Sequence, residues 1–432
     1  MKQKLIQLLY DLRHQPIIAW VTLIATAMSI FLIMVVVMMQ RVQVIPFSPE
    51  SCRDRLLLGI YIHAKSTENS QNNNDGSAGL SYSAARTLYE DLDGVEHTSF
   101  ITPTTEKIDV RGSSGETFAV NSRRVDSEFF KIFDHQLIAG RYFTADESAS
   151  VIPVAIVAET AARKAFGTTD CIGETLSVDH HNYTIVGVVK DNSALAKTGS
   201  GELFIVTGPD DPHMDWGQSM NEVNIFGPVA AALLVKEGVD FQSVRDQVKA
   251  RYAIIDTQLA PEEQETVYHE APYDQETIAT GLRGSNNTPD CSTGRIMRYC
   301  IYAILLIVPA INLSSMLHSR MRRRVSEIGV RRAYGCTRMR IITDIIAENF
   351  IITLIGGVIG LTLGIIFAST YSGLYEDMNS YGTNITPAMS AVLNWGTVFI
   401  AVGVCFILNL ISAAIPAWQA SRLNPVEAIN AK

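Results

Sequence analysis

The stretch PIIAWVTLIATAMSIFLIMVVVMM, residues 16–39, carries no charged side chain over 24 positions. A helix over this stretch is about 36 Å long at about 1.5 Å per residue, which exceeds the roughly 30 Å hydrocarbon core of a bilayer. It follows Lys2, Lys4 and Arg13, as a secretory signal would. However, its apolar part far exceeds the roughly 7–15 residues of a signal, and no small-residue cleavage site follows. We therefore expect a retained membrane anchor.

Three further apolar runs occur late in the chain, and nothing between residues 40 and 298 has comparable length. The composition, 47% hydrophobic and 18% charged, fits a few membrane helices joined to a soluble body. The predicted fold class is an α-helical membrane protein with four transmembrane helices and a large α+β extracytoplasmic domain of two lobes.

Basic residues near the ends of the apolar runs predict the orientation. The loop 319–346 contains eight arginines, whereas the loop 375–394 contains no Lys or Arg. Both termini and the Arg-rich loop are therefore expected in the cytoplasm of a cell with an inner membrane. The predicted order is a cytoplasmic segment (1–15), a span (16–39), a periplasmic core domain (40–298), a span (299–318), a cytoplasmic loop (319–346), a span (347–374), a periplasmic loop (375–394), a span (395–418) and a cytoplasmic tail (419–432).

The long outer segment is acidic. Residues 40–298 hold 22 Lys and Arg against 37 Asp and Glu, a net charge of −15. This argues against a nucleic-acid partner. Expected strands are 55–63, 118–125, 154–157, 175–178, 183–189, 203–206 and 230–235, and expected helices are 82–92, 127–137, 159–166 and 241–252.

Several ordered stretches resemble one protein family. They include VDSEFFKIF at 125–133, LIAGRYF at 137–143, YTIVGVVKD at 183–191, RRVSEIGVRRAYG at 323–335 and PAWQASRLNPVEAI at 416–429. In order and spacing this set resembles the MacB-like/FtsX-like permeases, the type VII ABC transporter permeases. The resemblance covers nearly the whole chain.

The resemblance implies a permease that works by mechanotransmission and exports a substrate. No G-x-x-x-x-G-K-[ST] phosphate loop occurs in the sequence, so ATP and Mg²⁺ are expected on a separate ABC ATPase subunit, with no cofactor in this chain. Other implied partners are a second copy or a sister permease, a periplasmic adaptor and an outer-membrane exit protein. Regulation of a cell-wall hydrolase and lipoprotein release are alternative roles.

The cytoplasmic loop supplies the candidate ATPase-coupling residues. Ser326 can cap a helix, an acidic residue favours its first turn and a glycine can end it. The alternative is that the arginines only fix topology and bind anionic lipid head groups. The candidates are Glu327, Ile328, Gly329, Val330, Arg331, Arg332 and Gly335.

Small residues at every fourth position of the third run allow close helix approach. They form either a dimer contact or a packing contact within one subunit, and the sequence leaves both open. These candidates are Gly356, Gly357, Gly360 and Gly364.

Cysteine and histidine positions suggest one further candidate. Cys52 and Cys291 both lie near the predicted membrane boundary, so they form a candidate disulfide. His180 and His181 are adjacent, and adjacent strand residues point to opposite faces, so we expect a turn pair and no metal site. No G-x-S-x-G or H-E-x-x-H motif predicts a catalytic residue.

Overall fold

The structure is a computed structural model. It describes residues 20, 21, 23, 24, 27, 28, 30–32, 35, 46–67, 75–113, 115–192, 196–214, 224–280, 288–301, 303, 304, 307, 330, 334–379, 403 and 407. Contacts divide the chain into two units. The first comprises Met1–Arg41, Ile296–Tyr371 and Val392–Lys432, and the second comprises Val42–Arg295 and Ser372–Ala391. We call residues 46–280 of the second unit the core domain.

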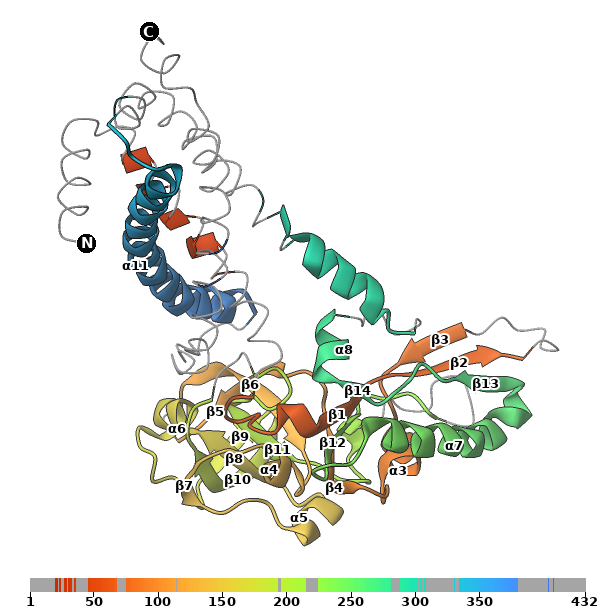
Figure 1. The fold of residues 1–432 in the computed structure, drawn as a ribbon. Coiled ribbons are helices and arrows are strands. Elements are labelled where there is room, and N and C mark those ends of the chain that lie inside the picture. Colours follow the sequence, from red (N-terminus) through yellow and green to blue (C-terminus); the bar gives the residue numbers. More distant parts are fainter. Residues whose placement is uncertain are drawn as a thin grey trace. The chain divides into compact units, whose positions relative to one another are not determined.

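An 11-stranded sheet organises the core domain (Figure 1). Strand β11 pairs with both β8 and β6, so six strands close into a ring, which we call the barrel lobe. Its strands are β11 (Leu203–Val206), β8 (Val154–Ala158), β10 (His181–Val189), β9 (Thr175–Val178), β5 (Glu106–Arg111) and β6 (Thr117–Val125), and β7 (Leu137–Gly140) pairs with β10.

The sheet continues from β6 into the second lobe, which we call the layered lobe. Its strands, in spatial order, are β4 (Val95–Ile101), β12 (Ala230–Val235), β1 (Leu56–Gly59) and β14 (Tyr273–Asp274). Helices α3 (Tyr82–Tyr89) and α7 (Phe241–Leu259) pack on each other beside it. A separate three-stranded sheet has the order β13 (Gln264–Val267), β2 (Ile62–Ser66) and β3 (Asp75–Ala78).

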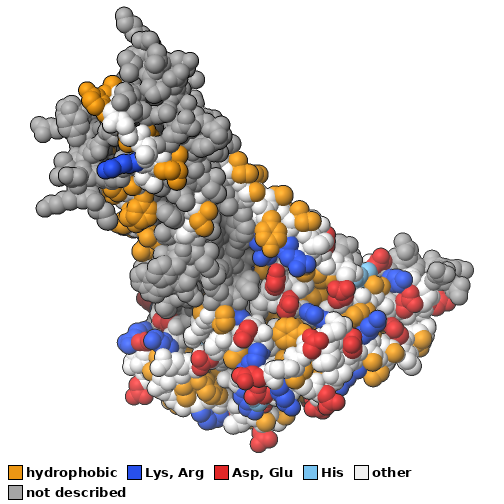
Figure 2. Space-filling view, in the orientation of Figure 1, with side chains coloured by type: hydrophobic (Ala, Val, Ile, Leu, Met, Phe, Trp, Pro, Cys, Tyr) orange, Lys and Arg blue, Asp and Glu red, His pale blue; other side chains and the backbone are white. Residues whose placement is uncertain are grey.

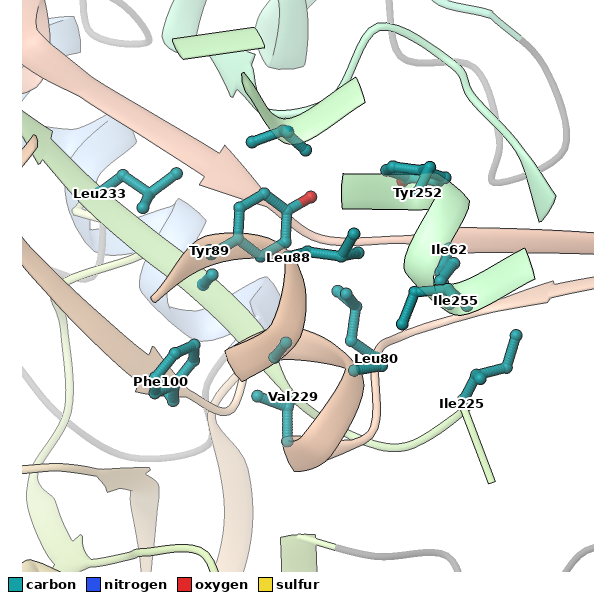
Figure 3. Packing of buried hydrophobic residues seen from close by; sticks show 14 of the residues in the cluster. Ile62, Leu80, Leu88, Tyr89, Phe100, Ile225, Val229, Leu233, Tyr252 and Ile255 are labelled. Atoms are coloured by element: carbon teal, nitrogen blue, oxygen red, sulfur yellow. The ribbon is translucent and has the colours of Figure 1, made fainter. Parts of the chain in front are cut away.

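Alternating side chains of the buried strands supply separate cores. On β12, Ala231, Leu233 and Val235 enter the core beneath α3 and α7, which Figure 3 shows in close-up. Leu234 and its neighbours on the other face enter a second core. A third core fills the barrel lobe against α6 (Glu159–Phe166).

The second core is shared by both lobes. Leu58 of β1 and Leu234 of β12 come from the layered lobe, whereas Ile156 of β8 and Phe204 of β11 come from the barrel lobe. Phe129, on the short helix α4 (Phe129–Ile132), is fully buried among them. Because both lobes bury side chains in one core, they are expected to unfold together.

Much of the expected secondary structure is confirmed. Strands 154–157, 175–178, 203–206 and 230–235 are present, and the helix 159–166 ends at Gly167, whose φ is +76°. That positive φ is the left-handed conformation that glycine adopts at helix ends. The expected strand 183–189 begins two residues earlier, and α7 continues past 252 to Leu259.

Three expected elements are wrong in extent. The helix predicted over 82–92 ends earlier, because α3 stops at Tyr89. The strand predicted over 55–63 is two strands, because the chain breaks at Ile60 and Tyr61 and passes from β1 into β2 of the other sheet. The helix predicted over 127–137 is only α4, after which Leu137 starts β7. Helical spacing of the phenylalanines there reflects packing into the shared core and not a long helix.

The described part of the first unit centres on α11 (Arg338–Asn379), whose residues from Ser372 onward belong to the second unit. This helix of 42 residues extends past both ends of the predicted third span. Among the described residues, no helix combines the length and the apolar character needed to cross a membrane. Most of the other three predicted spans lies outside the described residues, so the count of four stays a prediction.

Side chains of opposite charge are mixed over the face of the core domain seen in Figure 2. The helical residues 291–301 instead expose apolar side chains, including Ile296, Met297 and Tyr299.

Candidate functional site

A groove of about 460 Å³ opens on the core domain. Its walls come from α3, from β4, from residues 126–128 before α4, and from α5 (Ala145–Ala149). The α5 wall has only small side chains, Ala145, Ser148 and Ala149, and the two alanines are exposed. A volume of this size is typical of ligand sites.

The α5 wall is held in place by a capping box. The Thr144 hydroxyl accepts the backbone N–H of Glu147, and the Glu147 carboxylate accepts the backbone N–H of Thr144. Arg141 also donates to Glu147 at 2.6 and 2.8 Å and holds the pKa of that carboxyl at about 2. The groove wall is therefore a fixed helix start and not a free loop.

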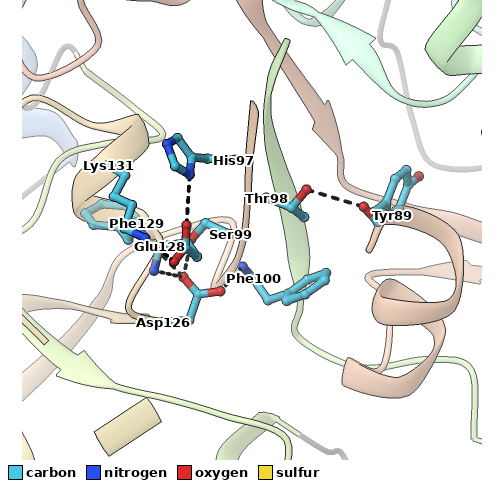
Figure 4. Close-up of polar contacts among 9 residues, drawn as sticks. All are labelled: Tyr89, His97, Thr98, Ser99, Phe100, Asp126, Glu128, Phe129 and Lys131. Atoms are coloured by element: carbon cyan, nitrogen blue, oxygen red, sulfur yellow. Dashed lines mark hydrogen bonds and ion pairs between the residues drawn. The ribbon is translucent and has the colours of Figure 1, made fainter. Parts of the chain in front are cut away.

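Asp126 lines the groove, and Figure 4 shows the polar contacts around it. One carboxylate oxygen accepts Ser99 Oγ at 2.6 Å and the backbone N–H groups of Glu128 and Phe129 at 3.1 and 3.2 Å. The other oxygen accepts only the backbone N–H of Phe100 at 2.7 Å. One side chain thus joins β4 to the start of α4.

Burial raises the pKa of Asp126 to about 6, against the opposing effect of its hydrogen bonds. Burial, and then the charge of Asp126, also raise the pKa of Tyr82, whose ring packs against Phe100 at a centroid distance of 5.3 Å. The donors on Asp126 are a hydroxyl and backbone groups, and in the described part of the chain no Lys or Arg pairs with it.

Three other carboxylates of the groove have cationic partners, and one of these is Glu96, which lies 3.4 Å from Arg55. Arg86 donates to Glu90 at 2.8 and 2.9 Å. Glu128 accepts Lys131 at 2.6 Å and lies 2.9 Å from Nδ1 of His97. These cations are therefore committed to carboxylates other than Asp126.

Sequence reasoning missed this groove. Its residues come from segments 82–100, 126–128, 145–149 and 209, and no linear motif connects them. The one local signal was Asp126 just before an apolar helical pattern, which is typical of a helix start.

The candidate coupling residues are only partly described. Val330 is helical and exposed, and its carbonyl accepts the backbone N–H of Tyr334 at 3.1 Å. Gly335 follows with φ of +88°, the conformation in which glycine ends helices. Glu327, Ile328, Gly329, Arg331 and Arg332 lie outside the described residues.

The four glycines of the predicted packing motif, Gly356, Gly357, Gly360 and Gly364, are all buried in α11. A Cβ on Gly360 would lie 2.7 Å from the Ala27 carbonyl oxygen and 3.0 Å from Cβ of Ile30, whereas one on Gly357 would make an ordinary 3.7 Å contact. The glycine face is therefore packed, at these two positions, against the first apolar run of the same chain.

The candidate disulfide is absent, because both cysteines are free thiols. Arg55 lies 3.6 Å from Sγ of Cys52, and Sγ of Cys291 donates to Thr277 at 3.6 Å. Each sulfur thus has a partner of its own.

The adjacent histidines His180 and His181 lie at a turn between two strands. His180 lies in the turn between β9 and β10 with φ of +68°, and His181 opens β10. Among the described residues, no three His, Cys, Asp or Glu side chains are grouped so as to hold a metal ion.

The fold and the groove define a class of protein in which a two-lobed α+β domain is bracketed by apolar segments. Two family profiles match this chain: MacB-like periplasmic core domain over residues 19–251, and FtsX-like permease C-terminal over residues 299–425. The chain belongs to the family of proteins that carry a MacB-like periplasmic core domain and an FtsX-like permease C-terminal region.

Named relatives agree with this assignment. The macrolide export ATP-binding/permease protein MacB of Bdellovibrio bacteriovorus is 25% identical over 300 residues, 68% of this chain and 41% of that protein. The uncharacterized ABC transporter permease YknZ of Bacillus subtilis is 23% identical over 339 residues, 79% of this chain and 76% of that protein. The chain thus spans about two fifths of the length of this MacB relative.

A solved structure is also similar. The periplasmic region of MacB from Actinobacillus actinomycetemcomitans is 14% identical, with a TM-score of 0.33, over 50% of this chain and 90% of that one.

Proposed function

We propose that this chain is the permease subunit of an ABC transporter and that a separate ATPase subunit drives it. The observation that carries this proposal is the succession of the two matched regions along one chain. Neither region is an ATP-binding domain, and the sequence has no phosphate loop for a nucleotide.

The proposed topology has four inner-membrane spans, with both termini and loop 319–346 in the cytoplasm and residues 40–298 in the periplasm. The eight arginines of loop 319–346 and the lack of Lys and Arg in loop 375–394 support this orientation. The matched family of core domains is described as periplasmic, which also supports a periplasmic location for residues 40–298.

The proposed mechanism is mechanotransmission. ATP binding in the partner moves the cytoplasmic loop through Glu327 to Arg332, and the membrane helices relay this motion to the core domain. An exposed Val330 followed by a glycine-terminated turn fits a short helix that presents one face to a partner. The shared core of the two lobes fits a domain that moves as a body.

The proposed outcome is export of a substrate. Relatives are named for macrolide export and for pyoverdine export, so the substrate class differs even among similar proteins. A homodimer or a pair with a sister permease, a periplasmic adaptor and an outer-membrane exit protein complete the proposed machine, and membrane lipids surround it.

The two alternative roles are control of a cell-wall hydrolase and release of lipoproteins. The match to a MacB-like core domain over 19–251 favours export. The identity of the bound periplasmic partner separates the three roles.

Co-purification tests the proposal. The full chain, tagged and extracted in mild detergent, should bring down an ABC ATPase, and Glu327→Lys should reduce that recovery at least about tenfold. The matched control is Glu276→Lys, the same charge reversal on an exposed core-domain residue, which should leave recovery unchanged. Absence of any ATPase after chemical cross-linking, or equal loss in both variants, contradicts the proposal.

A further inference from the structure

The groove beside Asp126 has a chemistry that the permease proposal does not use. We propose that it binds an arginine or lysine side chain presented by a segment of a partner protein. This inference rests on the core domain alone, and it stands whether or not an ATPase drives the chain.

Charge is the first argument. Five carboxylates line the groove, Glu90, Asp91, Glu96, Asp126 and Glu128, against one cation, Arg86. Arg86 is bound by Glu90, Lys131 by Glu128 and Arg55 by Glu96. Among the described residues, this leaves Asp91 and Asp126 of the groove without an ion pair. A basic group entering the groove meets a negative potential.

The geometry of Asp126 is the second argument. Its side chain is buried, with the residue 6% exposed, and it lines the groove. One of its oxygens accepts three donors and the other accepts only the Phe100 N–H, so the second oxygen keeps capacity for one more donor. A recessed carboxylate without a cationic partner favours a donor that is itself charged.

The groove walls suit a long basic side chain. Tyr82 and Phe100 supply aromatic rings that can pack against the alkyl stem or the face of a guanidinium. The small side chains Ala145 and Ala149 of α5 also line the groove, and both residues are exposed. An exposed wall of small residues favours a chain segment that lies across the groove over a small molecule that needs enclosure.

A peptide probe tests this with the full chain in mild detergent. The probe is fluorescein-labelled Ala-Leu-Arg-Leu-Ala amide, and its twin carries neutral citrulline in place of arginine. The expected result is saturable binding below about 1 mM for the arginine peptide, with the citrulline twin about tenfold weaker or more, as for loss of a charge-assisted hydrogen bond. The twin also corrects for partition into detergent.

Variants locate the binding. Asp126→Asn should weaken the arginine peptide about tenfold or more, and the same substitution at exposed Asp109 on β5 should not. Because Asp126 also holds α4, Ala149→Trp provides a second test: it fills the groove from an exposed position and should abolish binding without unfolding the domain.

Several results overturn the inference. The first is equal affinity for the two peptides, and the second is no saturable binding below about 1 mM. The third is an equal loss of peptide affinity in Asp109→Asn and Asp126→Asn. The fourth is undiminished peptide binding by a folded Ala149→Trp variant. Agmatine binding as tightly as the arginine peptide also overturns it, because the groove then takes a free organic cation and not a protein segment.

Discussion

At the scale of single residues, Asp126 has two effects that oppose each other. Its hydrogen bonds connect β4 to α4, which stabilises the native arrangement. Its burial penalises the charge, which raises its pKa to about 6 from the ordinary 3.8. Such a balance is common at binding sites, where a charge is kept ready for a ligand.

The pKa of Asp126 predicts a pH dependence with a defined sign. Between about pH 4 and 6 the folded chain binds a proton at Asp126 that the unfolded chain does not. The contribution of this proton to the free energy of unfolding is therefore complete below about pH 4 and is lost as the pH rises through about 6. We expect the difference in thermal midpoint, wild type minus Asp126→Asn, to grow as the pH falls from 6 to 4. From pH 7 to 8 the difference should stay constant.

Differential scanning fluorimetry of both proteins across this range provides the measurement. Asp109→Asn is the control, because it makes the same substitution at an exposed carboxylate outside the groove. A difference between wild type and Asp126→Asn that does not vary between pH 4 and 6 contradicts the assignment.

Residue-level prediction from sequence succeeded where one residue determines local geometry. Gly167 ends α6 because its φ is positive, and glycine adopts that conformation without strain. The free state of Cys52 and the groove around Asp126 could not be predicted, because both depend on which distant residues approach them.

At the scale of elements, α4 links the two lobes. The ring of Phe129 contacts those of Phe130, Phe133 and Phe204, with centroid distances of 5.1, 4.6 and 5.5 Å. Phe204 belongs to β11 of the barrel lobe, and β4 of the layered lobe packs on α4. A four-residue helix has little intrinsic stability, so this packing holds it.

Removing the ring of Phe129 should therefore destabilise both lobes. We expect Phe129→Ala to lower the free energy of unfolding by about 3–5 kcal/mol. Ile254→Ala on the exposed side of α7, where Ile254 is 50% exposed, should change it by less than about 0.5 kcal/mol. Urea unfolding with pulse proteolysis measures both, and cleavage confined to one lobe of Phe129→Ala contradicts a shared core.

The glycine face of α11 predicts a cross-link within one chain. Phe31 and Phe367 have ring centroids 5.7 Å apart, so their side chains meet. Cysteines at these two positions, once the native cysteines are replaced, should be joined by a short bismaleimide cross-linker, which spans the space that the two rings occupied. The product should migrate as a monomer on a non-reducing gel. Pairing Phe31→Cys with Ile366→Cys, where Ile366 is 57% exposed, is the control and should react less.

A dimer band from the Phe31→Cys, Phe367→Cys protein contradicts packing within one chain. It would show that the same face of α11 joins two subunits, which is the other arrangement that the glycine spacing permits.

Elements were predictable where the sequence pattern is local. Strands β8, β11 and β12 are short continuous apolar runs, and such runs indicate strands that are buried on both faces. The division of 55–63 between β1 and β2 was not predictable, since both halves are apolar and only the tertiary fold decides which sheet each enters.

At the scale of the whole molecule, the proposed transport function is divided between two proteins. The chain supplies a core domain and a permease region, and the proposed energy source is another protein. The membrane organisation stays a prediction from charge asymmetry and apolar runs, both of which reflect the solvent around each segment. Substrate and partner identity could not be predicted, because they depend on surfaces assembled from distant residues.

The most direct test is ATP hydrolysis by the purified chain, alone and with its co-purified partner. The account predicts no hydrolysis above background for the chain alone, and hydrolysis by the complex that a Walker A lysine substitution in the partner abolishes. Hydrolysis by the isolated chain, free of any ATPase by mass spectrometry, would contradict the claim that this protein is a permease driven by a separate subunit.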